Sequence, residues 1–253
     1  MTVVREAPAP GSLPLYELSD WRSRYGVVAG ITGRGADPDG GFDLGLWGDA
    51  PVAGVMTRWR AFRQADARFS AVVLGNQVHG TVVSRVDAGE GWIQVDGVDG
   101  WVTTRPGILL TVTVADCIPV YLLVPGRGVA LLHAGWRGTA GGILRAGVGR
   151  LKEATGASGP EIVMHCGVGI CGECYEVGSE VLTGCGVPAV GPGGPFHLDL
   201  RQRLMTEAGA LGLRMVTTSA WCSAHDRATF FSHRASRGSD GRMVAYLGIP
   251  SDD

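Results

Sequence analysis

The sequence predicts an α+β protein, a single domain in which mixed β-sheets form the centre and helices pack outside. Three observations support this fold class. Apolar runs of strand length recur along the chain, whereas only a few segments show helical spacing. No stretch of linker composition divides the 253 residues, so we expect one domain over 1–253. A chain of this length can bury one large core without disulfides or other staples.

The expected strands are short runs rich in valine, isoleucine and leucine that end at glycine or polar residues. They lie at residues 27–31, 70–75, 81–86, 91–95, 108–114, 118–124, 128–133, 161–164, 215–218 and 243–247. Residues 1–20 are expected to form a loose arm that could add an edge strand.

Three segments carry apolar side chains at helical spacing and are predicted to be helices, at residues 52–62, 139–154 and 199–212. Thr139 is a suitable N-cap for the second segment. Asp199 and Gly212 are suitable caps for the two ends of the third.

Composition and charge argue against several classes of partner. The formal net charge is −2 and no basic run stands out, so neither nucleic acid nor an anionic membrane has an electrostatic basis for binding. No apolar run reaches the roughly 18 residues of a membrane span. The first ten residues contain charge and proline too early for a signal peptide, so we expect a cytoplasmic protein whose six cysteines are reduced thiols or metal ligands rather than disulfides.

Three chemistry-bearing side chains follow apolar runs, namely His79, Cys117 and His133. A thiolate with two imidazoles suits Zn²⁺, with copper as second choice. Three protein ligands leave a fourth position open, which is typical of catalytic zinc. Singly, a strand-end histidine is more often a hydrogen-bonded structural residue, and a cysteine in an apolar run a core residue. The metal hypothesis therefore depends on the three acting together.

Charged neighbours of these residues could take part in the chemistry. Asp116 could orient a ligand histidine, act as a general base or cap a turn. Arg137, in a glycine-rich turn, could hold a phosphate or carboxylate, or form a surface ion pair. Arg234 is a candidate anion or substrate contact with the same alternative.

A further cysteine pattern lies at His165-Cys166 and at Cys171-Gly-Glu-Cys174. It lacks a second well-spaced pair, so it is weak evidence for a closed zinc site. It also lacks the signature of the nucleobase deaminases. We interpret it as a tight turn near the candidate site, with metal binding as the alternative.

Four motifs resemble the YfiH-like laccase-domain family, whose members have been called multicopper polyphenol oxidoreductases and purine nucleoside phosphorylases. They are Asn76-Gln77-Val78-His79-Gly80, Ala115-Asp116-Cys117-Ile118-Pro119-Val120, His133-Ala134-Gly135-Trp136-Arg137-Gly138 and Phe230-Phe231-Ser232-His233-Arg234. The resemblance covers about residues 30–247. It implies a four-layer αββα sandwich and a zinc site at His79, Cys117 and His133. It also implies phosphorolysis of adenosine, inosine, guanosine and methylthioadenosine, together with adenosine deamination.

The resemblance implies purine nucleosides and phosphate as partners, and we expect a monomer or small homo-oligomer. Arg137, with Arg34 or Arg234, would hold phosphate, and Asp116 would carry a proton. We expect Asn76, Gln77 and Trp136 to contact substrate, although Trp136 could equally be packing. The usual family tyrosine is His233 here, the usual first cysteine of a pair is Glu173, and an expected asparagine is Asp43. These departures bear on substrate preference.

Three alternatives use the same residues. Copper could support phenol oxidation, but the chain has only six histidines and no His-x-His pair. Cys117 could act without metal as a hydrolytic nucleophile, with His133 or His79 as base. The protein could instead be a zinc-stabilised binding factor, or an editing factor for peptidoglycan precursors.

Overall fold

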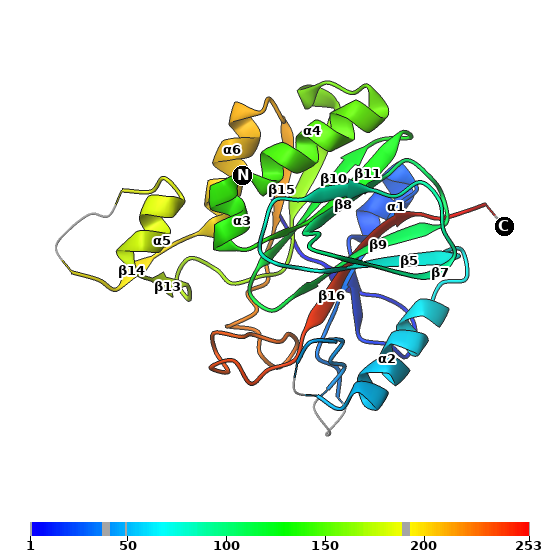
Figure 1. Ribbon diagram of the computed structural model, residues 1–253, viewed down its shortest axis with the longest axis horizontal. Coiled ribbons are helices and arrows are strands. Elements are labelled where there is room, and N and C mark those ends of the chain that lie inside the picture. Colours follow the sequence, from blue (N-terminus) through cyan, green and yellow to red (C-terminus); the bar gives the residue numbers. More distant parts are fainter. Residues whose placement is uncertain (1, 37–40, 49, 189–192, 253) are drawn as a thin grey trace.

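Two seven-stranded sheets pack face to face in the computed structural model, which describes residues 2–36, 41–48, 50–188 and 193–252 (Figure 1). In spatial order the first sheet contains β1 (Thr2–Val4), β15 (Met215–Ser219), β12 (Val163–Cys166), β10 (Ile118–Val124), β11 (Gly128–Ala134), β8 (Gly100–Thr103) and β6 (Val83–Arg85). The second contains β2 (Ala7–Pro8), β3 (Leu15–Glu17), β4 (Val28–Thr32), β16 (Met243–Ile249), β9 (Ile108–Val114), β5 (Ala71–Asn76) and β7 (Gly91–Asp96). Both sheets mix parallel and antiparallel pairs, as expected.

Helices pack around the two sheets. They are α1 (Ser19–Tyr25), α2 (Val52–Gln64), α3 (Trp136–Gly141), α4 (Ile143–Thr155), α5 (Ser179–Gly184) and α6 (Leu200–Ala210). A 3₁₀ turn, η1 (Gly159–Glu161), precedes β12. Figure 1 shows α5 projecting from the body with the small sheet of β13 (Glu176–Val177) and β14 (Phe196–His197). Among the described helices, none combines the length and apolar character needed to cross a bilayer.

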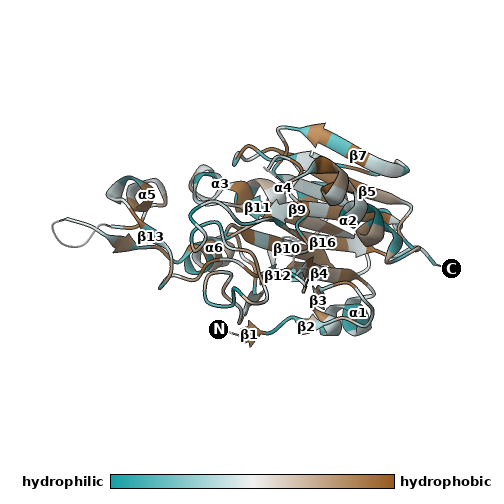
Figure 2. Ribbon diagram, turned by 90° about the horizontal axis from the view of Figure 1, so that it is seen from below, coloured by the Kyte–Doolittle hydropathy of each residue, from teal (hydrophilic) through white to brown (hydrophobic). Residues whose placement is uncertain are grey.

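Strand β10 explains why the fold has four layers. All seven of its residues are buried, because its side chains alternate between two apolar cores. Val120 and Leu122 join the core beneath α4 and α6. Tyr121 and Leu123 join the core between the two sheets. On the far side a third core lies between α2 and the second sheet, so the order is helix, sheet, sheet, helix (Figure 2).

The first 20 residues add edge strands, as expected, but they are not a loose arm. Strand β1 pairs in parallel with β15, and β2 and β3 extend the edge of the second sheet. Between them Glu6 is buried; one carboxylate oxygen lies 3.0 Å from His165 Nε2 and the other accepts a 2.7 Å hydrogen bond from Ser219. A buried carboxylate is costly unless it is paired, so these contacts hold the segment in place.

The predicted helix at 139–154 is two helices. Gly142 adopts a φ of +90°, a left-handed conformation that favours glycine, and it ends α3 before α4 begins. Thr139 is a buried residue inside α3 and does not cap a helix. Asp199 does cap α6, because its carboxylate accepts the backbone N–H of Gln202. Strand β8 was not predicted, because its Gly-Trp-Val-Thr run is short.

Candidate metal centre

The three predicted ligands come from the ends of strands in both sheets. His79 follows β5 of the second sheet, and His133 is the second-to-last residue of β11 in the first. Cys117 lies where the chain leaves β9 of the second sheet and enters β10 of the first. The site therefore lies at one end of the sandwich, where the chain crosses from the second sheet to the first.

The side chains of His79, Cys117 and His133 meet at this point. Their ligand atoms all lie within 4.8 Å of one another, and the two imidazole centroids are 4.8 Å apart. His133 is buried, Cys117 is partly exposed and His79 is exposed. One side of the cluster thus faces the protein interior and the other remains accessible to a small molecule.

Asp99, just before β8, organises the cluster from the buried side. Its carboxylate lies 2.9 Å from His133 Nδ1 and accepts hydrogen bonds from the backbone N–H groups of Val78, His79 and Gly80. With Nδ1 engaged, Nε2 of His133 is the nitrogen available to a metal. Asp99 was missed in the sequence, where its signal was a single acid inside the apolar run Val98-Asp99-Gly100-Trp101.

Backbone shape brings the ligands close together. A Cβ at Gly135 would lie 2.9 Å from His79 Cδ2 and 3.0 Å from Cys117 Sγ, so only glycine lets this turn approach the cluster. His79 and Asp116 have φ values of +59° and +86°, which are strained for residues with a Cβ. Strain of this kind is typical of functional sites.

The electrostatics couple the thiol to the histidines. Burial would raise the pKa of Cys117, but the charges and hydrogen bonds of His133 and His79 outweigh it and lower the pKa to about 6. Burial would lower the pKa of His133, but the Cys117 thiolate and Asp99 raise it to about 9. In the absence of metal the cluster is therefore a thiolate beside an imidazolium. The thiolate is also the form of cysteine that binds metal.

Asp116 is positioned by the C-terminal part of the chain. One carboxylate oxygen accepts a 2.6 Å hydrogen bond from the Ser223 hydroxyl and the other a 2.6 Å bond from the Arg234 backbone N–H. Its backbone carbonyl accepts the N–H of Ile170. Both oxygens are thus engaged, and the contacts hold the residue that precedes Cys117 in its unusual conformation.

A cavity of about 600 Å³ is lined by residues that adjoin the cluster, among them Trp136, Tyr175 and Arg234. The Arg137 guanidinium stacks 4.6 Å from the Trp136 ring and that of Arg234 5.1 Å from the Tyr175 ring. No carboxylate of the described residues forms an ion pair with either arginine. Arg234 also donates to the backbone carbonyl of Glu176. Aromatic faces beside arginines that have no carboxylate partner suit a flat base and an anion.

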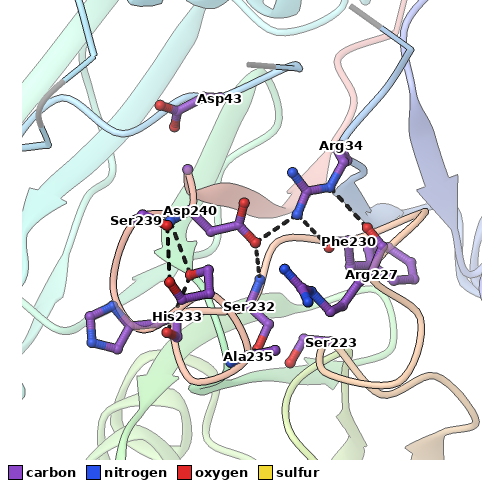
Figure 3. Close-up of polar contacts among 12 residues, drawn as sticks. Arg34, Asp43, Ser223, Arg227, Phe230, Ser232, His233, Ala235, Ser239 and Asp240 are labelled. Atoms are coloured by element: carbon purple, nitrogen blue, oxygen red, sulfur yellow. Dashed lines mark hydrogen bonds and ion pairs between the residues drawn. The ribbon is translucent and has the colours of Figure 1, made fainter. Parts of the chain in front are cut away.

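Two other predicted contacts, Arg34 and Gln77, already have partners within the protein. The Arg34 guanidinium bonds to the Asp240 carboxylate at 2.6 Å and donates to the carbonyls of Arg227 and Phe230 (Figure 3), so it holds a loop in place. Gln77 exchanges hydrogen bonds with Thr113 through both ends of its amide. Asn76 is the last residue of β5. His233 is exposed on the loop of residues 220–242 between β15 and β16, here called the C-terminal loop.

The donor set fits a divalent metal. Two imidazoles and a thiol with a lowered pKa are the ligand types that zinc prefers, and Asp99 supplies the outer support that such histidines usually have. His165 and Cys166, which belong to the second cysteine pattern, are not part of this cluster. His165 contacts Glu6, and Cys166 is a core residue.

Comparisons with known proteins agree with this geometry. Purine nucleoside phosphorylase YlmD of Geobacillus stearothermophilus is 34% identical over 88% of this chain and 90% of its own. Its crystal structure superposes with a TM-score of 0.86, at 28% identity, over 98% of this chain and 100% of that one. A purine nucleoside phosphorylase of Deinococcus radiodurans is 35% identical over 96% of this chain and 95% of its own.

A further relative is named adenosine deaminase RL5, from an unknown prokaryotic organism, and is 32% identical over 75% of this chain and 82% of its own. The family described as multi-copper polyphenol oxidoreductase laccase matches residues 27–250. With the four motifs, the double sheet and the three converging ligands in place, this chain belongs to that family.

Proposed function

We propose that this protein is a zinc-dependent purine nucleoside phosphorylase that also deaminates adenosine. The observation that carries the proposal is a cluster of three ligands with one exposed member, beside a cavity lined by Trp136, Tyr175 and Arg234. Arg137 stacks on Trp136 at the edge of this group. The names of several relatives, phosphorylase for most and deaminase for one, support the same assignment.

The donor chemistry favours zinc over copper. The cluster offers two imidazoles and one thiolate, whereas several coppers would need many more histidines. Of the six histidines in the chain, His165 is bonded to Glu6 and Thr217, and His197 approaches a backbone carbonyl. Bound zinc would be held by His79, Cys117 and His133 and would supply a Lewis acid that polarises a substrate oxygen or acidifies a water.

In phosphorolysis, a phosphate oxygen forms a bond to C1′ of the ribose while the bond from C1′ to the purine breaks. Arg137 and Arg234 would hold the phosphate, and neutralising its charge should lower much of the barrier. Trp136 would stack on the base. Burial and the nearby Cys117 thiolate raise the pKa of Tyr175 to about 12, so its hydroxyl stays protonated and can donate to the departing purine.

For deamination, water replaces the 6-amino group of adenosine and ammonia leaves. Asp116 was the expected proton carrier, but both of its oxygens already accept hydrogen bonds. We therefore assign Asp116 to positioning Cys117, and Arg34 to holding the C-terminal loop through Asp240. Adenosine, inosine, guanosine and methylthioadenosine share the purine and ribose that this cavity would recognise, and all four are proposed substrates.

A second candidate function is metal-free hydrolysis by Cys117. The specific observation in its favour is the pKa of about 6, which gives a reactive thiolate at neutral pH. The two functions differ in their need for phosphate and for metal.

The deciding experiment incubates the purified protein with inosine, with and without phosphate, and separates the products by chromatography. We expect hypoxanthine and ribose 1-phosphate only when phosphate and zinc are present. Cys117→Ala should abolish the reaction, whereas Cys166→Ala, a core cysteine away from the cluster, should retain it. Hypoxanthine formed without phosphate would favour hydrolysis, and product formation by Cys117→Ala would overturn the proposal.

A further inference from the structure

A second cluster of metal-binding side chains lies outside the site described above. The ligand atoms of Cys171, Cys174, Cys222 and His225 all lie within 4.8 Å of one another. Cys171 Sγ is 3.8 Å from His225 Nδ1, and the backbone N–H of Cys171 points at Cys222 Sγ at 3.3 Å. Cys222 is buried, the other two cysteines are partly exposed and His225 is exposed. Three thiols and an imidazole therefore converge at the protein surface.

Each half of the cluster is a tight turn with its two donors three residues apart. The first turn closes where the N–H groups of Cys174 and Tyr175 donate to the carbonyl of Cys171. The second closes where the N–H of Asp226 donates to the carbonyl of Cys222, while the Asp226 carboxylate accepts the Cys222 N–H. Cys-x2-Cys together with a second closely spaced pair is typical of structural zinc sites. The second pair of donors, which the sequence near Cys171 and Cys174 lacks, is therefore supplied by Cys222 and His225 from a distant segment.

The body of the protein holds the two turns against each other. Gly169 and Cys222 form a parallel β-bridge, and the Ser223 N–H donates to the Gly169 carbonyl at 3.0 Å. The Arg201 guanidinium donates to the carbonyls of both Gly169 and Trp221, at 2.9 and 2.6 Å. The residues that precede each pair of donors are therefore fixed before any ion binds.

We propose that Cys171, Cys174, Cys222 and His225 bind a second zinc ion, which has a structural role. Four protein donors complete a tetrahedral zinc and leave no position for substrate, and three thiolates select a soft metal over magnesium or calcium. On binding, the thiols release their protons to solvent and no redox step is involved. The zinc joins two segments that lie far apart in the sequence.

This second zinc supports the first centre through Asp116. Ser223, directly after Cys222, donates its hydroxyl to the Asp116 carboxylate, and Ile170, directly before Cys171, donates its N–H to the Asp116 carbonyl. Both turns thus contact the residue that precedes Cys117. Loss of the second zinc would loosen that residue without removing any ligand of the first.

Zinc content provides a test that does not depend on the proposed activity. Protein purified under reducing conditions is exchanged into metal-free buffer and loaded with zinc at one equivalent more than the two expected sites. It is then dialysed, and its zinc content is measured by elemental mass spectrometry. We expect about two zinc ions per chain, falling by about one in His225→Ala and by about one in Cys174→Ser. Cys166→Ala is the matched control and should keep both zinc ions. His225→Cys, unlike His225→Ala, should also keep both, because a fourth thiolate can replace the imidazole.

The variants separate the two centres. His225 is exposed, so His225→Ala should remain folded, which its circular dichroism verifies. If His225→Ala holds as much zinc as the wild type, the second site is wrong, whatever the wild-type count. If Cys117→Ala alone keeps its zinc, the first centre fails while the second stands. A Cys171–Cys174 disulfide in the reduced preparation would also overturn the inference.

Discussion

The two cysteine–histidine clusters use the same kinds of donor atom in different surroundings. The first, at His79, Cys117 and His133, has three donors, of which His79 is exposed and His133 is supported by a buried carboxylate. The second, at Cys171, Cys174, Cys222 and His225, has four donors on two surface turns. The difference teaches that donor count and outer support, more than donor identity, separate a reactive metal centre from a structural one.

Thiol reactivity in metal-free protein should show the largest contrast between the clusters. The histidines lower the pKa of Cys117 to about 6, whereas burial and the thiols of Cys171 and Cys222 raise that of Cys174 to about 12. Because only the thiolate reacts, alkylation of Cys117 should persist as the pH falls and decline only through about 6. Cys174 should react appreciably only at strongly alkaline pH.

The measurement is iodoacetamide labelling of chelator-treated protein across a pH series, with sites quantified by peptide mass spectrometry. Protein reloaded with zinc is the control, in which both thiols should be protected. Equal labelling of Cys117 and Cys174 at neutral pH would show that the two clusters do not differ in this way.

Asp99→Asn should weaken the first centre alone. The amide keeps the shape of the carboxylate but loses its charge, so it supports His133 and the three N–H groups less well. Loss of such an outer partner typically costs about 10- to 100-fold in metal affinity or activity. Chelator competition should show weaker zinc binding at one of two sites, and Asp87→Asn, which removes a surface ion pair with Arg85, should leave both unchanged.

Gly135→Ala should displace the ligands of the first centre. Its Cβ would come within 3.0 Å of both His79 and Cys117, and crowding of this kind costs about 1–3 kcal/mol. Gly149→Ala is the matched control, because this exposed glycine of α4 has no atom within 4 Å of a new Cβ. Urea unfolding should show Gly149→Ala stabilised by about 0.5–1 kcal/mol, and a Gly135→Ala protein with native zinc affinity would contradict the close approach.

Ser223→Ala tests the link between the clusters and should have the smallest effect on metal binding. It leaves one oxygen of the buried Asp116 carboxylate without its partner, which costs about 1–3 kcal/mol of unfolding free energy. Zinc content should stay the same, since no ligand is lost. Ser239→Ala, which removes an exposed hydroxyl, should be neutral in the same urea titration.

The sequence predicted that His79, Cys117 and His133 would come together, because each follows or ends an apolar run and strand ends meet at the edge of a sheet. That these residues bind a metal stays a prediction. Cys117 and His133 lie on neighbouring strands, and the chain crosses between sheets at Cys117. Most strands were also predicted correctly, since their valine- and leucine-rich runs are nearly continuous. The arrangement in two packed sheets was implied by the family resemblance and is confirmed.

Contacts between distant segments could not be predicted in the same way. Nothing near Asp99 in the sequence indicates that its carboxylate faces His133, and nothing near Cys174 points to His225. Arg34 shows the opposite error: an arginine in a glycine turn looked like an anion contact, but Asp240 occupies it. Glu6 likewise acquires its partner only when β12 and β15 lie side by side.

Anomalous X-ray diffraction from crystals of the zinc-loaded protein, measured on both sides of the zinc absorption edge, tests the central claim most directly. We predict two peaks, one between His79, Cys117 and His133 and one between Cys171, Cys174, Cys222 and His225. The first should show a non-protein fourth ligand and the second four protein ligands. Absence of a peak at the three-residue cluster would contradict the account of the reactive centre, and absence at the four-residue cluster would contradict the structural one.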